Sequence, residues 1–324
     1  MGGTLADVLG AVFPQRRVST IEERSSRPGN VTALVTFADG ERLFLKTATD
    51  GGDRLVRETA ATRFAGERCP VGVPAVAAAD PRGDPPFLAT RPLPGVALAD
   101  RWETGDGTRE RLLRRAGRLI AGVHEVRFDR PGRILGGDGT GLDVEEVSWS
   151  EVLAATVEER AADLYAARFG DVPDRLATVV RDAGSLLDEA PTTLLHGDPT
   201  RTNCRIDPSG LLDWERAIVG DPGLDIADAI DRLVDRPDVS DGDRERLKRA
   251  LLTGYRGRAE SLPEGFDRRR PLYRAVAFDI VPKTFELWAP AAEDPTDDLE
   301  AWVREEFDAR LARAREAIER REDR

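Results

Sequence analysis

The first ninety residues alternate between short apolar runs and polar turns, a pattern typical of β-strands. Two of these runs, residues 31–37 and 42–46, flank the segment Ala38-Asp39-Gly40-Glu41, and Asp-Gly between apolar runs is a strong hairpin signal. A helical pattern follows over residues 54–67, and two more apolar runs occupy residues 73–79 and 86–91. This part of the chain therefore predicts a small, mainly β unit that includes one helix.

Beyond residue 91 the apolar positions change to a helical period. Pro92-Leu93-Pro94-Gly95 breaks the strand pattern, and stripes of apolar residues at helical spacing follow within residues 112–123, 176–187 and 303–318. One β-like island, residues 193–214, interrupts them. The sequence predicts an α+β fold with two lobes, a small β-rich N-lobe over residues 1–91 and a larger helical C-lobe over residues 92–324. Ligands often bind in clefts at such boundaries.

Composition narrows the classes of function. The chain has 324 residues, of which 40% are hydrophobic and 33% charged, as in a soluble globular protein. It has no apolar run of the about 18 residues that a membrane helix needs and no signal-peptide pattern, so we expect a cytoplasmic protein without a membrane partner. Two cysteines and two histidines are too few for a disulfide framework or a zinc centre. A net charge of −12 argues against a nucleic-acid partner.

The positive charge is supplied almost entirely by arginine. Lys46, Lys248 and Lys283 are the only lysines. An excess of acidic residues with few lysines is typical of halophilic proteins, which stay soluble where salt screens self-repulsion, although a GC-rich genome would produce part of the same bias. The scarcity makes each lysine a candidate for a specific role.

The island and the residues after it carry the strongest chemical signal. In order, the segment reads His196-Gly197-Asp198, Asn203, Asp213-Trp214-Glu215, Gly220-Asp221-Pro222 and Asp225. Phosphoryl transfer needs a carboxylate that orients and deprotonates the attacking hydroxyl, together with oxygen ligands for Mg²⁺, and a loop followed by a hairpin can bring such groups together. Asp and Asn are also common turn residues, but their joint occurrence in this pattern favours a site.

This composite pattern resembles the signature of the aminoglycoside phosphotransferase and choline kinase superfamily, small-molecule kinases with a protein-kinase-like fold. The resemblance implies that Asp198 is the catalytic base and that Asn203 and Asp213 hold Mg²⁺. It also implies that His196 and Asp225 brace the loop. The recognisable landmarks cover residues 18–231, and the remainder resembles the family only in being helical.

The N-lobe supplies a second candidate group. In kinases, a strand lysine contacts the nucleotide phosphates and pairs with a helix glutamate. Lys46 ends a predicted strand, and Glu58 on the next predicted helix is its natural partner, with Glu67 also available. The alternative is that these residues are ordinary exposed charges.

Two further segments resemble nucleotide-binding parts of the family. The chain lacks a glycine-rich phosphate loop, and the turn at residues 25–30 stands in its place, with Ser26, Gly29 and Asn30 as candidate contacts to phosphate. Residues 89–95 resemble the hinge that meets the adenine, which makes Arg91 and Leu93 candidate nucleotide contacts. Arg91 stands where relatives often carry an acidic residue, so the resemblance assigns no role to its side chain.

Together these observations predict a phosphotransferase that uses ATP and Mg²⁺ to phosphorylate a hydroxyl of a small molecule. The alternatives are a kinase acting on a protein and a catalytically silent nucleotide-binding module. Seven residues separate Asp213 from Asp221, too few for the long activation segment on which peptides dock in protein kinases. A silent module is disfavoured because Asp198, Asn203 and Asp213 are all present. His124, at the end of a predicted amphipathic helix, is expected to pack in the core or to cap that helix.

Overall fold

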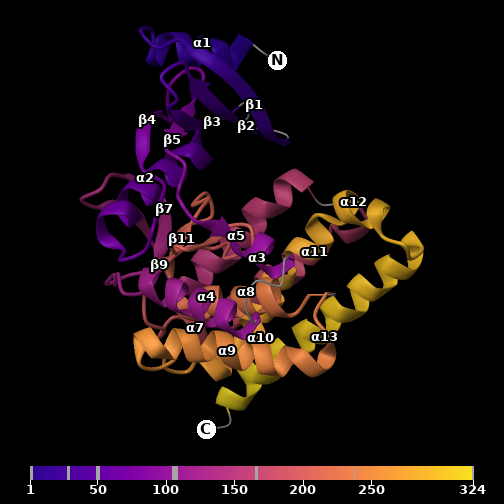
Figure 1. Ribbon diagram of the computed structural model, residues 1–324. Coiled ribbons are helices and arrows are strands. Elements are labelled where there is room, and N and C mark those ends of the chain that lie inside the picture. The colour runs from indigo at the N-terminus through magenta and orange to yellow at the C-terminus, as the bar shows by residue number, and fades with distance from the viewer. Residues whose placement is uncertain are drawn as a thin grey trace.

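The N-terminal part of the molecule is an antiparallel sheet of five strands. The computed structural model describes residues 3–27, 30–48, 52–103, 109–164, 167–236 and 238–322. The strands are β1 (Val18–Arg27), β2 (Asn30–Phe37), β3 (Arg42–Ala48), β4 (Val76–Asp80) and β5 (Phe87–Thr90), in the spatial order β1-β2-β3-β5-β4. Figure 1 shows this sheet at one end of the molecule, away from the C-terminal helices.

The β2–β3 hairpin forms where the sequence predicts it. Gly40 adopts a φ of +86°, which suits glycine, and the Asp39 carboxylate accepts a hydrogen bond of 3.0 Å from the Glu41 N–H. A helix that the strand pattern does not predict, α1 (Gly3–Val12), precedes the sheet. It buries Leu5, Val8 and Leu9 against the sheet, so the N-terminal region is less purely β than expected.

Helix α2 (Asp53–Arg68) connects the sheet to the rest of the molecule. Its residue Leu55 packs with Ala48 and Leu88 of the sheet. One and a half turns or more further along, Ala61 and Phe64 belong to a hydrophobic core shared with the C-terminal part. The two faces of α2 are thus buried against different parts of the chain, which fixes the position of the sheet relative to the helices.

The C-terminal part is mostly helical, as the apolar stripes predict. Its longer helices are α4 (Arg109–Val123), α5 (Trp149–Leu164), α6 (Val172–Asp182), α8 (Pro222–Ala229), α9 (Asp241–Ala259), α10 (Phe266–Phe278) and α13 (Thr296–Glu322). Shorter helical elements are α3 (Leu98–Glu103), α7 (Gly184–Leu187), α11 (Ile280–Lys283), α12 (Phe285–Trp288) and the 3₁₀ turns Ala167–Phe169 and Ala289–Ala291. None of the helices in the described ranges is long and apolar enough to cross a membrane.

Two small sheets lie within this helical part. The predicted island forms β9 (Thr193–Leu195), β10 (Cys204–Ile206) and β11 (Gly210–Leu211), and β10 also pairs with β6 (Val96–Ala97). A second hairpin, β7 (Gly132–Gly137) and β8 (Leu142–Glu146), was not predicted, so the expectation of a single β island was wrong. Its glycine-rich strand β7 pairs with β12 (Ile218–Gly220), which also pairs with β9, in the order β8-β7-β12-β9. This sheet anchors the segment that carries the predicted site.

Candidate active site

The loop after β9 presents Asp198 through a backbone held by Asp225. The Asp225 carboxylate accepts hydrogen bonds from the backbone N–H groups of His196 and Gly197, at 2.7 and 2.8 Å. Gly197 has a φ of +76°, and a Cβ at this position would collide with the carbonyl oxygen of Arg216. Only glycine fits such a position without strain, so the His-Gly-Asp order follows from the shape of this turn.

The imidazole of His196 braces the same turn from inside. Its Nε2 lies 2.9 Å from the carbonyl oxygen of Leu212, and its Nδ1 accepts from the backbone N–H of Asp198 at 3.3 Å. These partners assign the proton to Nε2. The ring is fully buried and packs edge to face against Trp214, with 4.8 Å between the two ring centroids. The geometry agrees with a bracing role, because neither ring nitrogen is left to take part in proton transfer.

Asp225 is itself held by a histidine from a distant helix. His124, just beyond α4, places its Nε2 3.2 Å from the Asp225 carboxylate and its Nδ1 3.0 Å from the hydroxyl of Tyr255. Burial alone would raise the pKa of Asp225, but the contacts with His124 and the backbone donors hold that pKa below its usual value. His124 is buried, as expected, but it supports the loop through Asp225 in addition to packing.

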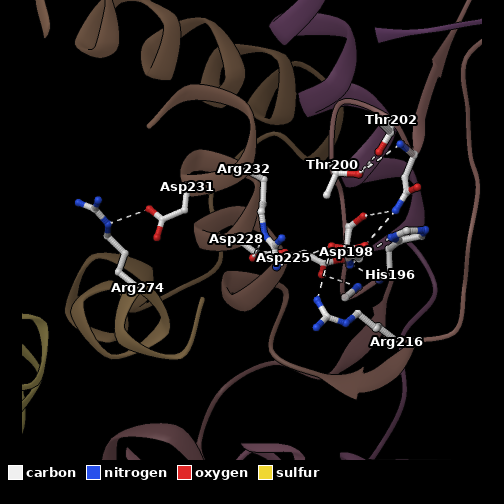
Figure 2. A network of polar contacts seen from close by, with 12 residues as sticks. His196, Asp198, Thr200, Thr202, Arg216, Asp225, Asp228, Asp231, Arg232 and Arg274 are labelled. Carbon is white, nitrogen blue, oxygen red and sulfur yellow. Dashed lines mark hydrogen bonds and ion pairs between the residues drawn. The ribbon is translucent and has the colours of Figure 1, made fainter. Parts of the chain in front are cut away.

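Each oxygen of Asp198 has a different environment. Oδ2 accepts a hydrogen bond of 3.0 Å from the side-chain amide of Asn203, which also donates to the Asp198 carbonyl. Oδ1 is buried and accepts no hydrogen bond from the residues that the structure describes, but the guanidinium groups of Arg216 and Arg232 lie 3.5 and 3.7 Å from it. Figure 2 shows the two arginines converging on Asp198 from different elements.

Arg232 reaches Asp198 from a π-helical turn, Ile230–Val234, that continues α8. Its Nε donates to the carboxylate of Asp228, four residues earlier, at 3.0 Å. Burial raises the pKa of Asp228, and Arg232 opposes that shift. Turns of the π type are rare in proteins as a whole, but those that occur are often found at functional sites. Here the turn directs Arg232 towards Asp198 and its neighbour Asp231 towards Arg274 (Figure 2).

The second group of charges surrounds Lys46 on β3. Its Nζ lies 2.8 Å from the Glu58 carboxylate on α2, so the predicted pair is present; Glu67 is exposed instead. The same Nζ lies 3.2 Å from Asp213 and 3.1 Å from Glu215. One ammonium group therefore faces three carboxylates.

These carboxylates lie close enough to share a metal ion. Among the described residues, Glu58, Asp213 and Glu215 each offer an oxygen within 4.8 Å of the others. Asp213 has a φ of +64°, uncommon for a residue with a side chain, and such conformations cluster at functional sites. Asn203 is nearby, because its carbonyl accepts from the N–H of Leu212. Oxygen ligands of this kind suit Mg²⁺.

The charges of this cluster shift each other's protonation. Burial would lower the pKa of Lys46, but the three carboxylates outweigh it and raise that pKa well above its usual value. Burial raises the pKa of Glu58 to about 7, helped by Asp213 and Glu215 and opposed by Lys46. The site is thus short of positive charge, and a bound cation would relieve it.

The structure describes only some of the residues predicted for the phosphate-binding turn and the hinge. Gly29 lies outside the described residues, as does the side chain of Ser26, while Asn30 begins β2. Arg91 is half exposed and pairs with Glu41 at 3.3 Å, and its N–H donates to Ala75.

The side chain of Leu93 lies beside two glycines, Gly72 and Gly210. It therefore packs where two backbone segments, one from each part of the molecule, approach each other.

A sequence profile described as the phosphotransferase enzyme family matches residues 20–272, most of the chain. The chain belongs to this family. None of the curated proteins matches this phosphotransferase significantly.

Solved structures share the phosphotransferase's fold over nearly its whole length. A protein from Thermobifida fusca described as a candidate fructosamine-3-kinase is 21% identical, with a TM-score of 0.62 over 98% of this chain and 99% of that one. A choline/ethanolamine kinase family protein from Mesorhizobium loti is 17% identical, with a TM-score of 0.59 over 97% and 99% of the two chains. APH(2″)-IIIa, solved with GDP and kanamycin, is 13% identical, with a TM-score of 0.59 over 95% and 98%. The kinase-like α+β fold is thereby confirmed.

Sequence reasoning missed several residues of the phosphotransferase's candidate site. Glu215 lies within the Asp-Trp-Glu motif, so its position beside Asp213 could have drawn attention to it. Asp228 and Arg232 have the i,i+4 spacing of a helical ion pair, which was a readable signal. Nothing in the sequence indicated the π turn or the contact of His124 with a residue 101 positions away.

Proposed function

We propose that this phosphotransferase transfers the γ-phosphate of ATP, bound with Mg²⁺, to a hydroxyl of a small molecule. The observation that carries the proposal is the convergence of two charged groups from distant parts of the chain. Lys46 and Glu58 from the sheet region meet Asp213 and Glu215, and the loop that carries Asn203 and Asp198 lies directly before that segment.

The nucleotide phosphates would bind at the Lys46 cluster. Lys46 would hold phosphate oxygens by charge, with Glu58 fixing the direction of its ammonium group. Asp213 and Asn203 would hold Mg²⁺, with Glu215 as a further candidate ligand. Three carboxylates around one lysine leave a net negative charge that a bound cation would neutralise. When bound, Mg²⁺ would neutralise the phosphate charge that develops during transfer.

Asp198 would act on the acceptor. The acceptor hydroxyl would donate its proton to the Asp198 carboxylate while its oxygen attacks the γ-phosphorus and ADP leaves. Asn203 fixes the Asp198 side chain, and Asp225 with His196 fixes its backbone, so the carboxylate is oriented before the acceptor arrives. Positioning of this kind supplies most of the catalysis in phosphoryl transfer.

A small acceptor is favoured over a protein. Strand β12 begins at Ile218, five residues after Asp213, and pairs with both β7 and β9. No long segment in this part of the chain could form a platform for a peptide. The rival function, a silent nucleotide-binding module, has no specific observation in its favour.

Calorimetry and an ADP-release screen test the proposal together. We expect ATP to bind more tightly with Mg²⁺ than without it, and we expect ADP release with members of a panel of amino alcohols, sugars, amino acids and aminoglycosides. GTP should be tested beside ATP. Replacement of Asp213 by Ala should abolish the Mg²⁺ dependence of binding, whereas Asp267→Ala, at an exposed position of α10, should not. Absence of any effect of Mg²⁺, or phosphorylation of folded proteins with a silent panel, would contradict the proposal.

A further inference from the structure

Two arginines flank the carboxylate proposed to receive the acceptor's proton. Arg216 lies between β11 and β12, and Arg232 lies in the π turn, yet both guanidinium groups come within 4 Å of Asp198 Oδ1. Their side chains are only 19% and 17% exposed. Covering an arginine to this extent costs solvation energy, so these are not ordinary surface charges.

The donors of these two arginines are only partly used. Arg232 donates its Nε to Asp228, which fixes the direction of the guanidinium plane. Arg216 donates no hydrogen bond to any residue in the described ranges, and Asp198 is its only ion-pair partner there. Its backbone is nevertheless fixed, because Gly197 packs directly against its carbonyl. Both contacts with Asp198, at 3.5 and 3.7 Å, are longer than hydrogen bonds. N–H donors therefore remain available for a ligand beside the reacting position.

We propose that the acceptor carries a carboxylate close to the hydroxyl that is phosphorylated, and that Arg216 and Arg232 bind it. This inference rests on the proposed function, since it places the acceptor hydroxyl at Asp198. Because both guanidinium groups lie within 4 Å of Asp198 Oδ1, they would also lie near the atoms adjacent to a hydroxyl bound there. A carboxylate there matches planar donors that favour bidentate contacts, whereas an ammonium group would meet two like charges.

The charge balance during the reaction favours the same acceptor. The O–H bond of the acceptor breaks and its proton moves to Asp198, while a new O–P bond forms and the bond from the γ-phosphorus to the bridging oxygen breaks to release ADP. Protonation removes the charge of Asp198, so two guanidinium groups are then left with Asp228 as their one ionised partner among these residues. A carboxylate on the acceptor restores the balance.

Matched pairs of acceptors test the inference. Serine carries a carboxylate where ethanolamine carries a hydrogen, and glycerate carries a carboxylate where glycerol carries a hydroxymethyl group. With saturating Mg·ATP, we expect kcat/KM for the carboxylate member of a pair to be higher by about tenfold or more, the scale of a charge-assisted hydrogen bond.

Variants of Arg216 and Arg232 test whether these two residues bind the carboxylate of the acceptor. Arg216→Gln should raise the KM of the carboxylate acceptor and reduce its advantage over the uncharged partner, with the KM of Mg·ATP unchanged. Because Arg232→Gln alone would leave Asp228 buried without its partner, the double variant Asp228→Asn/Arg232→Gln removes the pair together. Arg236→Gln, exposed just beyond the π turn, is the matched control and should change neither KM.

The outcomes separate this inference from the proposed function. If Mg·ATP does not bind and no acceptor is used, the proposed function itself is wrong. If Mg·ATP binds but no carboxylate acceptor is phosphorylated, or cationic acceptors are preferred, the inference is overturned. It is also overturned if the arginine variants lower kcat equally for every acceptor, since the arginines would then act only by orienting Asp198.

Discussion

Two charged groups of the candidate site, one around Lys46 and one around Asp198, differ in their balance. On the side of the sheet, Lys46 faces the three carboxylates of Glu58, Asp213 and Glu215. In the second group, two arginines face two carboxylates, Asp198 and Asp228. The first group lacks positive charge, and the second is neutral as it stands.

This difference indicates what each side requires from outside the chain. A buried excess of carboxylates is unfavourable unless a cation or a proton joins it, which explains the raised pKa of Glu58. The neutral group needs no metal, and its balance changes only when Asp198 takes up a proton. This difference supports the proposal that the sheet side binds Mg²⁺ with a nucleotide and that the group around Asp198 meets the acceptor.

Removing the base should have the largest effect on activity. Asp198→Asn keeps the shape of the side chain but cannot accept the proton, so we expect turnover to fall by about 10²–10⁴-fold while Mg·ATP still binds. Steady-state kinetics with calorimetry measures both quantities, and Asp294→Asn, in an exposed segment, is the control. Near-normal turnover would remove Asp198 from its role.

Removing Lys46 should lower the stability of the folded protein, because the carboxylates of the sheet side would lose their cation. Lys46→Met leaves three carboxylates without a cation, and we expect a loss of about 3–5 kcal/mol in the free energy of unfolding, the usual cost of breaking a buried pair. Mg²⁺ should restore part of it, because a ligand that binds only the folded state stabilises it.

The control is Lys248→Met, which removes a partly exposed lysine paired with Glu245 and should cost less than about 1 kcal/mol. Thermal and urea unfolding with and without Mg²⁺ measure these changes. Equal stability of Lys46→Met and the unmodified protein would show that the carboxylates do not depend on Lys46.

The pH dependence of Mg²⁺ binding tests whether the sheet side has an excess of carboxylates. Burial raises the pKa of Glu58 to about 7, and a neighbouring dication favours the ionised form, so Mg²⁺ binding must displace the proton of Glu58 below pH 7. We therefore expect Mg²⁺ affinity to decrease as the pH falls from 8 to 6, by up to about tenfold per unit below pH 7. The Mg²⁺-induced rise in Tm at each pH measures this.

Glu58→Gln should flatten this profile, whereas Glu245→Gln, at an exposed position, should leave it unchanged. An unmodified protein whose Mg²⁺ affinity is the same at pH 6 and pH 8 would contradict the account of the sheet side.

Salt should have the smallest effect. If the acidic, lysine-poor composition reflects a halophilic protein, we expect Tm to rise by a few degrees in molar KCl and to fall in dilute buffer, because salt screens the repulsion within a chain of net charge −12. A Tm that does not increase with KCl would leave genome composition as the simpler explanation.

The sequence predicted the parts of this structure that depend on local pattern. The β2–β3 hairpin, α2 and the stripe of α13 follow from periodicity and turn residues, and the pairing of Lys46 with Glu58 follows from a strand and a helix adjacent in the chain. Helix α1 has an apolar stripe of its own but is short, and β7 is rich in glycine, which weakens a strand pattern.

The rest depends on contacts between distant segments. Nothing near His124 in the chain indicates that it holds Asp225, and nothing near Arg216 indicates that it meets Asp198 beside Arg232. Such positions are decided by how β9, β12, α4 and α8 pack together. The motif was therefore readable from the sequence, but the charges that surround Asp198 were not.

Phosphorus-31 NMR of the complete reaction tests the central claim most directly. With ATP, Mg²⁺ and a hydroxyl acceptor, we predict that the signal of a phosphate monoester of the acceptor grows in step with ADP, and that omission of Mg²⁺ or the Asp198→Asn substitution suppresses both. Formation of ADP with inorganic phosphate alone, at a rate that no acceptor changes, would contradict transfer to a small-molecule hydroxyl.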